Sequence, residues 1–259
     1  MDRSFLSNDA LVNASRNFIC IRTATYEDAE EAEFLRKIFS GRGGELENTV
    51  FALLTPDAQS TLSRTGRSPQ FAFRSAQSMA TAMDNLALKF PGKPETPVTS
   101  LPVMKDVRLA VNVSACDGLP LVVVYGKDEE QLKELEKELL PLAFSPNLAG
   151  KFTYAKTTNP NDIETIIGFD KGEYGFAVIT PSQYGISGKV QHQWPAAVEP
   201  AQLGRGLSAL ANATSKVEKN HNQHVRGGMN QGISWKTAIP VEDKMSLRAM
   251  QGRQQRNQR

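Results

Sequence analysis

Apolar and polar positions follow two different periods along this chain, and the period separates predicted helices from predicted strands. Apolar residues recur every three to four positions over residues 27–39 and 75–90, which is the spacing of one face of an α-helix. Residues 17–22 carry apolar side chains on both faces and predict a central strand. Residues 48–67 predict a β-hairpin that turns at Pro56-Asp57.

The second half repeats this succession of elements in pattern, not in residue identity. Residues 106–116 have helical spacing, although their β-branched residues leave a strand over 107–113 as the alternative. Residues 119–125 are apolar on both faces, as in a buried parallel strand. The remaining predicted elements are a helix at 127–142, a strand at 150–155, a short helix at 162–167, a hairpin of 174–179 with 189–194, and a closing helix at 199–211. We therefore predict an α/β protein with a central mixed sheet flanked by helices.

Four prolines between residues 91 and 102 interrupt these periods and predict a linker. The chain then divides into a domain at 1–90, a linker at 91–105, a second domain at 106–215 and a tail at 216–259. The tail is basic and rich in Gln, Asn and Arg, so we expect it to be mostly disordered. Trp235 and Ile239 are its candidates for docking on the second domain.

The charge and hydropathy of the chain limit its partners. The formal net charge is only +2 over 259 residues, so the charge of the chain before the tail does not indicate nucleic-acid binding. Only the terminal QGRQQRNQR suits weak, salt-sensitive contacts with RNA or anionic surfaces. No apolar run is long enough to span a bilayer, and the first residues lack the basic and apolar regions of a signal peptide. As written, the chain is expected in the cytoplasm, and no motif predicts a cofactor or metal.

The chain has two cysteines, Cys20 and Cys116, and they are the candidates for any thiol chemistry. Their separation excludes a Cys-x-x-Cys pair, a thiolate zinc site and a disulfide framework, and leaves one interdomain disulfide open. Cys20 lies in a predicted central strand, where we expect it in the core. Cys116 is the more accessible candidate for a single-thiol peroxidase, although the neighbouring Asp117 disfavours the thiolate that such an enzyme needs.

A glycine-rich stretch, Gly41-Arg42-Gly43-Gly44, precedes the hairpin. It lacks the strand, the helix and the Lys-Ser/Thr pair of a phosphate loop, so we interpret it as a connector. Arg42, Arg64 and Arg67 could gather near the hairpin and form a small anion-attracting patch.

Two stretches of the first half carry a family resemblance. The opening MDRSFLSNDALVNASRNFICIR is similar to the helix and strand that follow the active-site loop of thioredoxin-like domains. The stretch ENTVFALLTPDAQSTLSRTGR resembles the hairpin of the same family, and residues 106–211 resemble a second, more diverged copy. The resemblance implies tandem thioredoxin-like domains, of the superfamily that includes bacterial disulfide reductases and redox-inert relatives. The first domain would lack its opening strand.

The thiol pair of that family is missing from the corresponding loop of the second half, Tyr125-Gly126-Lys127-Asp128-Glu129. The chain as written is therefore not a competent dithiol oxidoreductase, and we expect a binding or scaffolding role toward a protein partner. The alternative is a thiol-disulfide oxidoreductase whose Cys-x-x-Cys, or selenocysteine, is encoded upstream of Met1. A signal peptide in such an extension would direct the protein to the periplasm or out of the cell.

Overall fold

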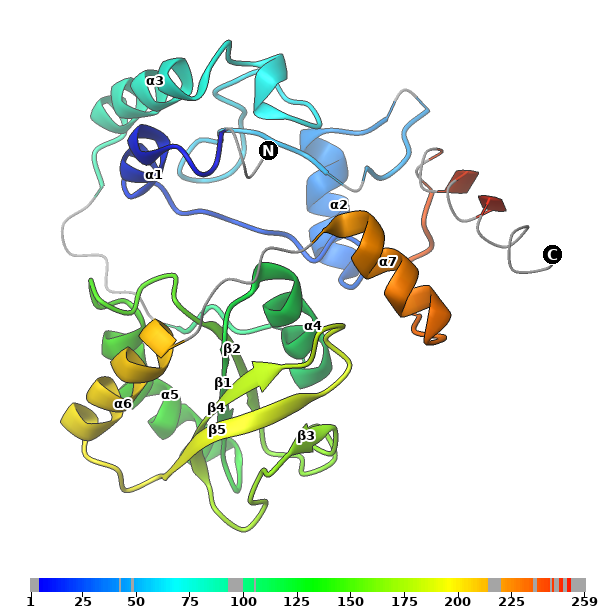
Figure 1. The fold of residues 1–259 in the computed structure, drawn as a ribbon. Helices are drawn as coiled ribbons and strands as arrows, with labels where there is room; N and C mark the ends of the chain where they lie inside the picture. The colour runs from blue at the N-terminus through cyan, green and yellow to red at the C-terminus, as the bar shows by residue number, and fades with distance from the viewer. Residues whose placement is uncertain are drawn as a thin grey trace. The chain divides into compact units, whose positions relative to one another are not determined.

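The computed structural model describes residues 5–41, 43–47, 49–92, 100–104, 106–213, 220–234, 237–242, 244, 247–248 and 251–252. The chain divides into two compact units (Figure 1). Unit 1 comprises residues 1–95 together with 235–259, and unit 2 comprises residues 96–234. The boundary falls within the stretch predicted as a linker. Over the described residues the fold is α/β, with helices in both units and one five-stranded mixed sheet in unit 2.

In its described residues up to 92, unit 1 has three α-helices and a short 3-10 helix. The α-helices are α1 (Asp9–Ser15), α2 (Ala29–Ile38) and α3 (Ala76–Lys89), and the 3-10 helix is η1 (Pro69–Phe71). The predicted helices at 27–39 and 75–90 are thus confirmed. Each begins at a side chain that accepts hydrogen bonds from the free amides of the first turn: Asn8 for α1, Asp28 for α2 and Ser75 for α3.

The main core of unit 1 lies between α1 and α3. Leu11 and Ala14 of α1 and Met79, Ala80 and Met83 of α3 are all buried there. A smaller cluster forms around α2, from Ala32, Leu35 and Leu46. Helix packing through these two clusters supplies the apolar burial that holds unit 1 together.

The predicted hairpin at 48–67 forms as two isolated antiparallel bridges, Phe51 with Gly66 and Leu54 with Thr61. Between them the Leu53 amide donates to Ser63 Oγ at 3.1 Å, and this side-chain bond interrupts the backbone ladder. The regular sheet expected for the first half is therefore absent from its described residues. What remains is an irregular hairpin packed on the main core.

The strand predicted at residues 17–22 is wrong. The Phe18 amide donates to the Ser15 carbonyl at 3.0 Å and closes a turn after α1, and residues 19–24 have no regular structure. Ile19 and Ile21 are 92% and 63% exposed, and Cys20, expected in the core, is exposed as well. An apolar run becomes a strand only where a neighbouring strand offers backbone partners, and among the described residues none does so here.

Unit 2 contains the sheet, in the order β2-β1-β4-β5-β3. Its strands are β1 (Leu121–Tyr125), β2 (Thr153–Thr157), β3 (Ile166–Ile167), β4 (Gly175–Pro181) and β5 (Gly188–Pro195). β1 pairs with β2 in parallel and with β4 antiparallel, and β4 pairs antiparallel with β5. The predicted buried strand at 119–125 and the hairpin of 174–179 with 189–194 are confirmed. All five residues of β1 are buried, as its interior place in the sheet requires.

Helices cover both faces of this sheet (Figure 1). They are α4 (Val107–Asp117) on one face and α5 (Glu129–Ala143) with α6 (Pro200–Ala213) on the other. Alternate residues of β1 point to opposite faces, so Leu121 and Val123 pack toward α4 while Val122 and Val124 pack toward α5 and α6. The helices predicted at 127–142 and 199–211 are confirmed.

Helix α4 settles the alternative left open at residues 106–116. The Asp106 carboxylate accepts from the Leu109 amide at 2.6 Å, and Gly118 ends the helix in the left-handed conformation at φ 66°. Ala110 and Val111 are buried against the sheet. The strand alternative at 107–113 is wrong because this apolar face outweighs the low helix propensity of the valines.

The short helix predicted at 162–167 is also wrong. Asp162 accepts from Thr157 Oγ1 at 2.6 Å and from Asn159 Nδ2 at 3.2 Å, which ties the segment into a turn after β2. Ile166 is then buried in the core under α4, and β3 pairs in parallel with the start of β5. In the same turn Thr157 Oγ1 accepts from the Asn159 amide and Asn159 Oδ1 accepts from the Asn161 amide, both at 3.0 Å. Side chains that bond neighbouring backbone in this way compete with the first turn of a helix.

Two parts of the predicted tail are ordered. Helix α7 (His221–Asn230) belongs to unit 2, where the His224 ring lies 4.7 Å from the ring of Tyr184. Ile239 packs in the small cluster of unit 1, so its expected docking on the second domain is wrong. Trp235 lies outside the described residues. The apolar surface beside α2 offers Ile239 a partner that the sequence pattern did not reveal.

Candidate functional site

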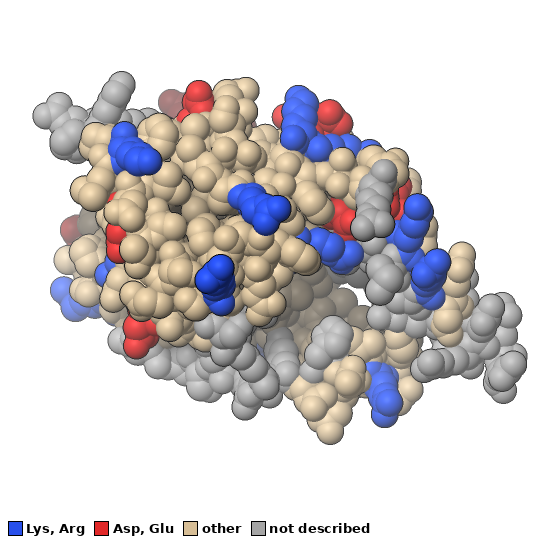
Figure 2. Space-filling model, turned by 90° about the horizontal axis from the view of Figure 1, so that it is seen from above, with Lys and Arg blue, Asp and Glu red and all other residues tan. Residues whose placement is uncertain are grey.

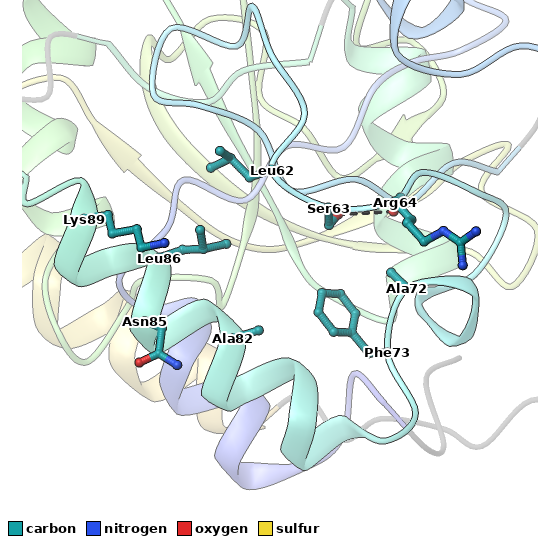
Figure 3. Close-up of a pocket in the computed structure, with 9 residues that line it drawn as sticks. All are labelled: Leu62, Ser63, Arg64, Ala72, Phe73, Ala82, Asn85, Leu86 and Lys89. Atoms are coloured by element: carbon teal, nitrogen blue, oxygen red, sulfur yellow. Dashed lines mark hydrogen bonds between the residues drawn. The ribbon is translucent and has the colours of Figure 1, made fainter.

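Unit 1 contains an open groove of about 320 Å³ between the hairpin and α3 (Figure 3). Three parts of the chain line it: the second limb of the hairpin, the residues after η1, and one face of α3. The lining residues are Leu62, Ser63, Arg64, Ala72, Phe73, Ala82, Asn85, Leu86 and Lys89. The volume is at the lower end of the range for small-ligand sites, so the groove suits a short segment or a small molecule.

Helix α3 forms one wall of the groove because one of its faces is buried in the core and another lines the groove. Ala82, Asn85, Leu86 and Lys89 are three or four residues apart and therefore share one face. The core residues Met79 and Met83 lie on an adjacent face of the same helix. The helix thus buries one stripe and presents a second stripe, apolar at its centre and polar at its edges, to the groove.

The floor of the groove is the outer layer of the unit 1 core. Leu62, Phe73 and Leu86 are half-buried and pack against its buried residues. The Phe73 ring meets the Phe51 ring edge to face, with centroids 6.1 Å apart. The Leu53 amide holds Ser63 through the 3.1 Å hydrogen bond already described. Packing on one side and hydrogen bonding on the other give the groove a preformed shape.

Two cations stand at opposite ends of the groove, Arg64 and Lys89 (Figure 3). Both residues are exposed, and no Asp or Glu is among the lining residues. Asp84 of α3 lies two residues from Ala82 and so turns away from the groove face. An apolar floor between two positive charges fits a ligand that is anionic and partly apolar.

The predicted anion patch is not assembled in the part of the chain that the structure describes. Arg42 lies outside it, and Arg64 is one of the residues that line the groove. Arg67 Nη1 is 3.0 Å from Oε2 of the buried Glu47, which accepts no well-aligned hydrogen bond there and compensates the charge of Arg67. In the face shown in Figure 2, Lys and Arg side chains are spread over a surface that is mostly uncharged.

The glycine stretch before the hairpin is followed directly by Glu45, which accepts hydrogen bonds from its amides. The Gly43 amide donates to Glu45 Oε2 at 2.7 Å, and the Gly41 amide donates to the Glu45 carbonyl at 2.9 Å. A Cβ on Gly41 would overlap the side chain of Glu45. Both amides therefore already donate to Glu45, one to its carboxylate and one to its carbonyl, in place of the phosphate that a phosphate loop would bind.

The two thiols lie in different units, and both are exposed. Cys20 Sγ lies 4.0 Å from the Ser15 carbonyl oxygen. Cys116 lies in the last turn of α4, near the free carbonyls of the helix end. A helix N-terminus or a neighbouring cation activates a catalytic thiolate, and neither residue lies at a helix N-terminus.

At the carboxyl end of β1, where the thioredoxin-like resemblance would place a redox motif, unit 2 closes the loop with its own side chains. Asp128 accepts from the Gln131 amide at 2.8 Å, and Gln131 Oε1 accepts from the Lys127 amide at 2.8 Å. The Tyr125 ring packs against Phe169 and Tyr174. Burial, and to a smaller extent the Tyr174 hydroxyl, raise the pKa of Tyr125, so its hydroxyl stays protonated and donates to the Lys171 carbonyl at 3.4 Å.

Sequence reasoning singled out Arg64 but missed its groove partners, Phe73, Asn85 and Lys89. The sequence pattern that could have revealed them is the second stripe of α3, where the polar residues Asn85 and Lys89 flank Leu86 on a face away from the core.

No group of His, Cys, Asp and Glu suited to a metal ion is found among the described residues. None of the helices described is long and apolar enough to cross a membrane. Comparison of the chain with protein-family models, curated proteins and solved structures gives no match.

Proposed function

We propose that this chain is a binding protein whose unit 1 holds a short, acidic and partly apolar segment of a partner protein in the groove between the hairpin and α3. The observation that carries the proposal is the placement of Arg64 and Lys89 at opposite ends of a preformed apolar floor whose lining residues include no Asp or Glu. Each cation gains a partner when an acidic side chain or a terminal carboxylate arrives.

Apolar side chains around the groove support a protein partner over a small metabolite. Phe71, next to the lining residue Ala72, is 63% exposed. Exposed apolar residues beside a groove extend the contact surface beyond the bound segment. A protein that presents an acidic segment on an apolar surface can bury both features at once.

For unit 2 we propose a thioredoxin-like domain without thiol chemistry. The order of elements supports it: an interior strand β1, a loop, the long helix α5, the parallel strand β2, the antiparallel hairpin of β4 and β5, and the closing helix α6. The self-capped loop from Lys127 to Gln131 supports a structural role for the position that carries the thiol pair in that family.

The test of the groove is selection from a random peptide phage library on the immobilised full chain. We expect enrichment of peptides with Asp or Glu flanking apolar residues. The double variant Arg64→Glu/Lys89→Glu should lose about tenfold or more of the affinity for the selected peptides, because two attractive charges become repulsive. The matched control Arg16→Glu/Arg74→Glu makes the same change of charge at exposed positions of unit 1 outside the groove.

Equal binding by the two double variants, or no enrichment at all, contradicts the groove proposal. The proposed absence of catalysis is tested separately by dithiothreitol-dependent insulin reduction. We expect the purified chain to leave the uncatalysed rate unchanged, and turnover that Cys20→Ser or Cys116→Ser abolishes would overturn it.

A further inference from the structure

The segment Thr237–Glu242 makes contacts in unit 1 that resemble those of a bound peptide. The described part of this segment has no helix or strand, and its contacts are to residues about two hundred positions earlier in the chain. Ala238 and Pro240 are exposed, whereas Ile239 is half-buried. The segment therefore touches unit 1 through selected positions, as short linear motifs do.

Ile239 is the apolar anchor of this contact. Its amide donates to the Tyr26 carbonyl oxygen at 2.8 Å, and its side chain packs against the cluster of Ala32, Leu35 and Leu46. The Tyr26 hydroxyl donates to the Leu46 carbonyl at 3.2 Å and so connects the two sides of the site. The site thus contacts both the backbone amide and the side chain of Ile239.

Glu242, three positions later, is the charged anchor. Its Oε2 accepts from Arg36 Nη2 at 3.0 Å and from the Leu46 amide at 3.5 Å. The side chains of Arg36 and Glu242 are 30% and 44% exposed, so water screens the pair and its contribution is small. A half-buried isoleucine and a screened ion pair make a contact that another segment of the same chemistry can replace.

We propose that the surface of Tyr26, Arg36 and Leu46 is a peptide-recognition site for partner segments with an aliphatic residue three positions before a carboxylate. Thr237–Glu242 is its resident, tethered occupant. A tethered segment competes at a high effective concentration, so partner binding at this site is restrained in the intact chain. This site and the groove share no residue, and each proposal can fail without the other.

The test uses the isotope-labelled full chain and the unlabelled peptide Thr-Ala-Ile-Pro-Val-Glu, followed through the backbone amide signals of Ala32 and Leu46. In the variant Ile239→Ala/Glu242→Gln the site is vacated, and we expect saturable shifts of these signals. The wild-type chain should bind the peptide at least about tenfold more weakly, because its own segment competes.

Charge controls make the assignment specific. Adding Arg36→Glu to the vacated chain should abolish binding, whereas adding Lys37→Glu, an equal change at the exposed neighbouring position, should not. Arg64→Glu/Lys89→Glu should also leave it unchanged. Dispersed signals from unit 1 verify folding in each variant, and Glu242→Gln alone is a second receptor that keeps Ile239. Absence of saturable shifts in both receptors, equal binding by the wild type, or binding that survives Arg36→Glu overturns the proposal.

Discussion

The two units solve the same problem of burying apolar residues in different ways. Unit 2 places β1 inside a regular sheet and covers both faces with helices, so that Val122, Val123 and Val124 are all fully buried. Unit 1 has helices and isolated bridges, and side chains such as Ser63 take over backbone partners. A continuous ladder satisfies every backbone group and lets both faces be covered, which an interrupted hairpin cannot do.

The consequence for function follows from what each unit leaves at its surface. Unit 1 exposes Ile19, Ile21 and Leu88, and it carries the groove and the site of the Thr237–Glu242 segment. In unit 2 the loop after β1 is closed by its own capping side chains, Asp128 and Gln131. The comparison is consistent with the two proposals, in which unit 1 provides the recognition surfaces, and unit 2 is the unit with the regular, well-packed sheet.

The largest expected effect separates the two cores. Phe176 is 0% exposed in unit 2, so Phe176→Ala should lower the free energy of unfolding by about 3–5 kcal/mol. Phe73 is half-buried at the groove floor, and Phe73→Ala should cost clearly less because fewer of its atoms leave an apolar environment. Urea unfolding followed by hydrogen exchange of peptides from each unit measures both. Equal losses would contradict the difference in packing.

A pair of glycine substitutions compares loops with the same backbone conformation. Gly44 in unit 1 and Gly185 in unit 2 have φ of 82° and 65°, so an alanine at either costs about 1–2 kcal/mol of backbone strain. A Cβ on Gly44 meets nothing within 4 Å, whereas one on Gly185 lies 2.6 Å from Cα of Asn112. Thermal unfolding should therefore show a larger loss for Gly185→Ala. A larger loss for Gly44→Ala would mean that the hairpin loop of unit 2 is the looser one.

The pH dependence of unit 2 tests its partly buried ion pair. Partial burial raises the pKa of Glu136, but hydrogen bonds from Lys156 and from the Leu101 amide outweigh it and hold the pKa below its ordinary value. A lowered folded-state pKa gives stability that is present above the unfolded-state pKa and is lost as the pH falls through the folded-state pKa. Glu136→Gln should flatten this acid limb in unfolding measurements from neutral to acidic pH.

The control for that measurement is Glu138→Gln, an exposed carboxylate on the same helix. It should leave the acid limb as in the wild type. If Glu136→Gln and Glu138→Gln behave alike, the ion pair does not contribute to the acid sensitivity of unit 2.

The smallest expected effect concerns the thiols. Because Cys20 and Cys116 are both exposed, Cys20→Ser and Cys116→Ser should each change the free energy of unfolding by no more than about 0.5 kcal/mol. Both thiols should react with a maleimide in the folded chain. If Cys20→Ser lowers the free energy of unfolding by more than about 1 kcal/mol and Cys20 reacts slowly with the maleimide, Cys20 is buried. That result would favour the buried strand predicted at 17–22 and would weaken the contrast between the units.

For the candidate sites, the sequence identified single residues but not the neighbours that complete each site. Arg64 stood out as a cation near a hairpin, but its groove needs Phe73 and Leu86, which the fold brings beside it. Ile239 stood out as an apolar residue in a polar tail, but its docking surface lies beside α2, about two hundred residues away in the chain. Which residues share a surface depends on contacts between distant segments, and no local pattern encodes them.

By itself, the sequence determined the helices α2, α3, α5 and α6 and the strands β1, β4 and β5, because each has an apolar face long enough to form with many partners. It also determined the absence of a thiol pair. Only the tertiary structure decided the fate of weakly patterned segments. Residues 17–22 and 49–54 have similar apolar character, yet the first is a turn followed by exposed coil from residue 19 and the second is one limb of an irregular hairpin. A strand needs hydrogen-bond partners from elsewhere in the chain, whereas a helix finds them within itself.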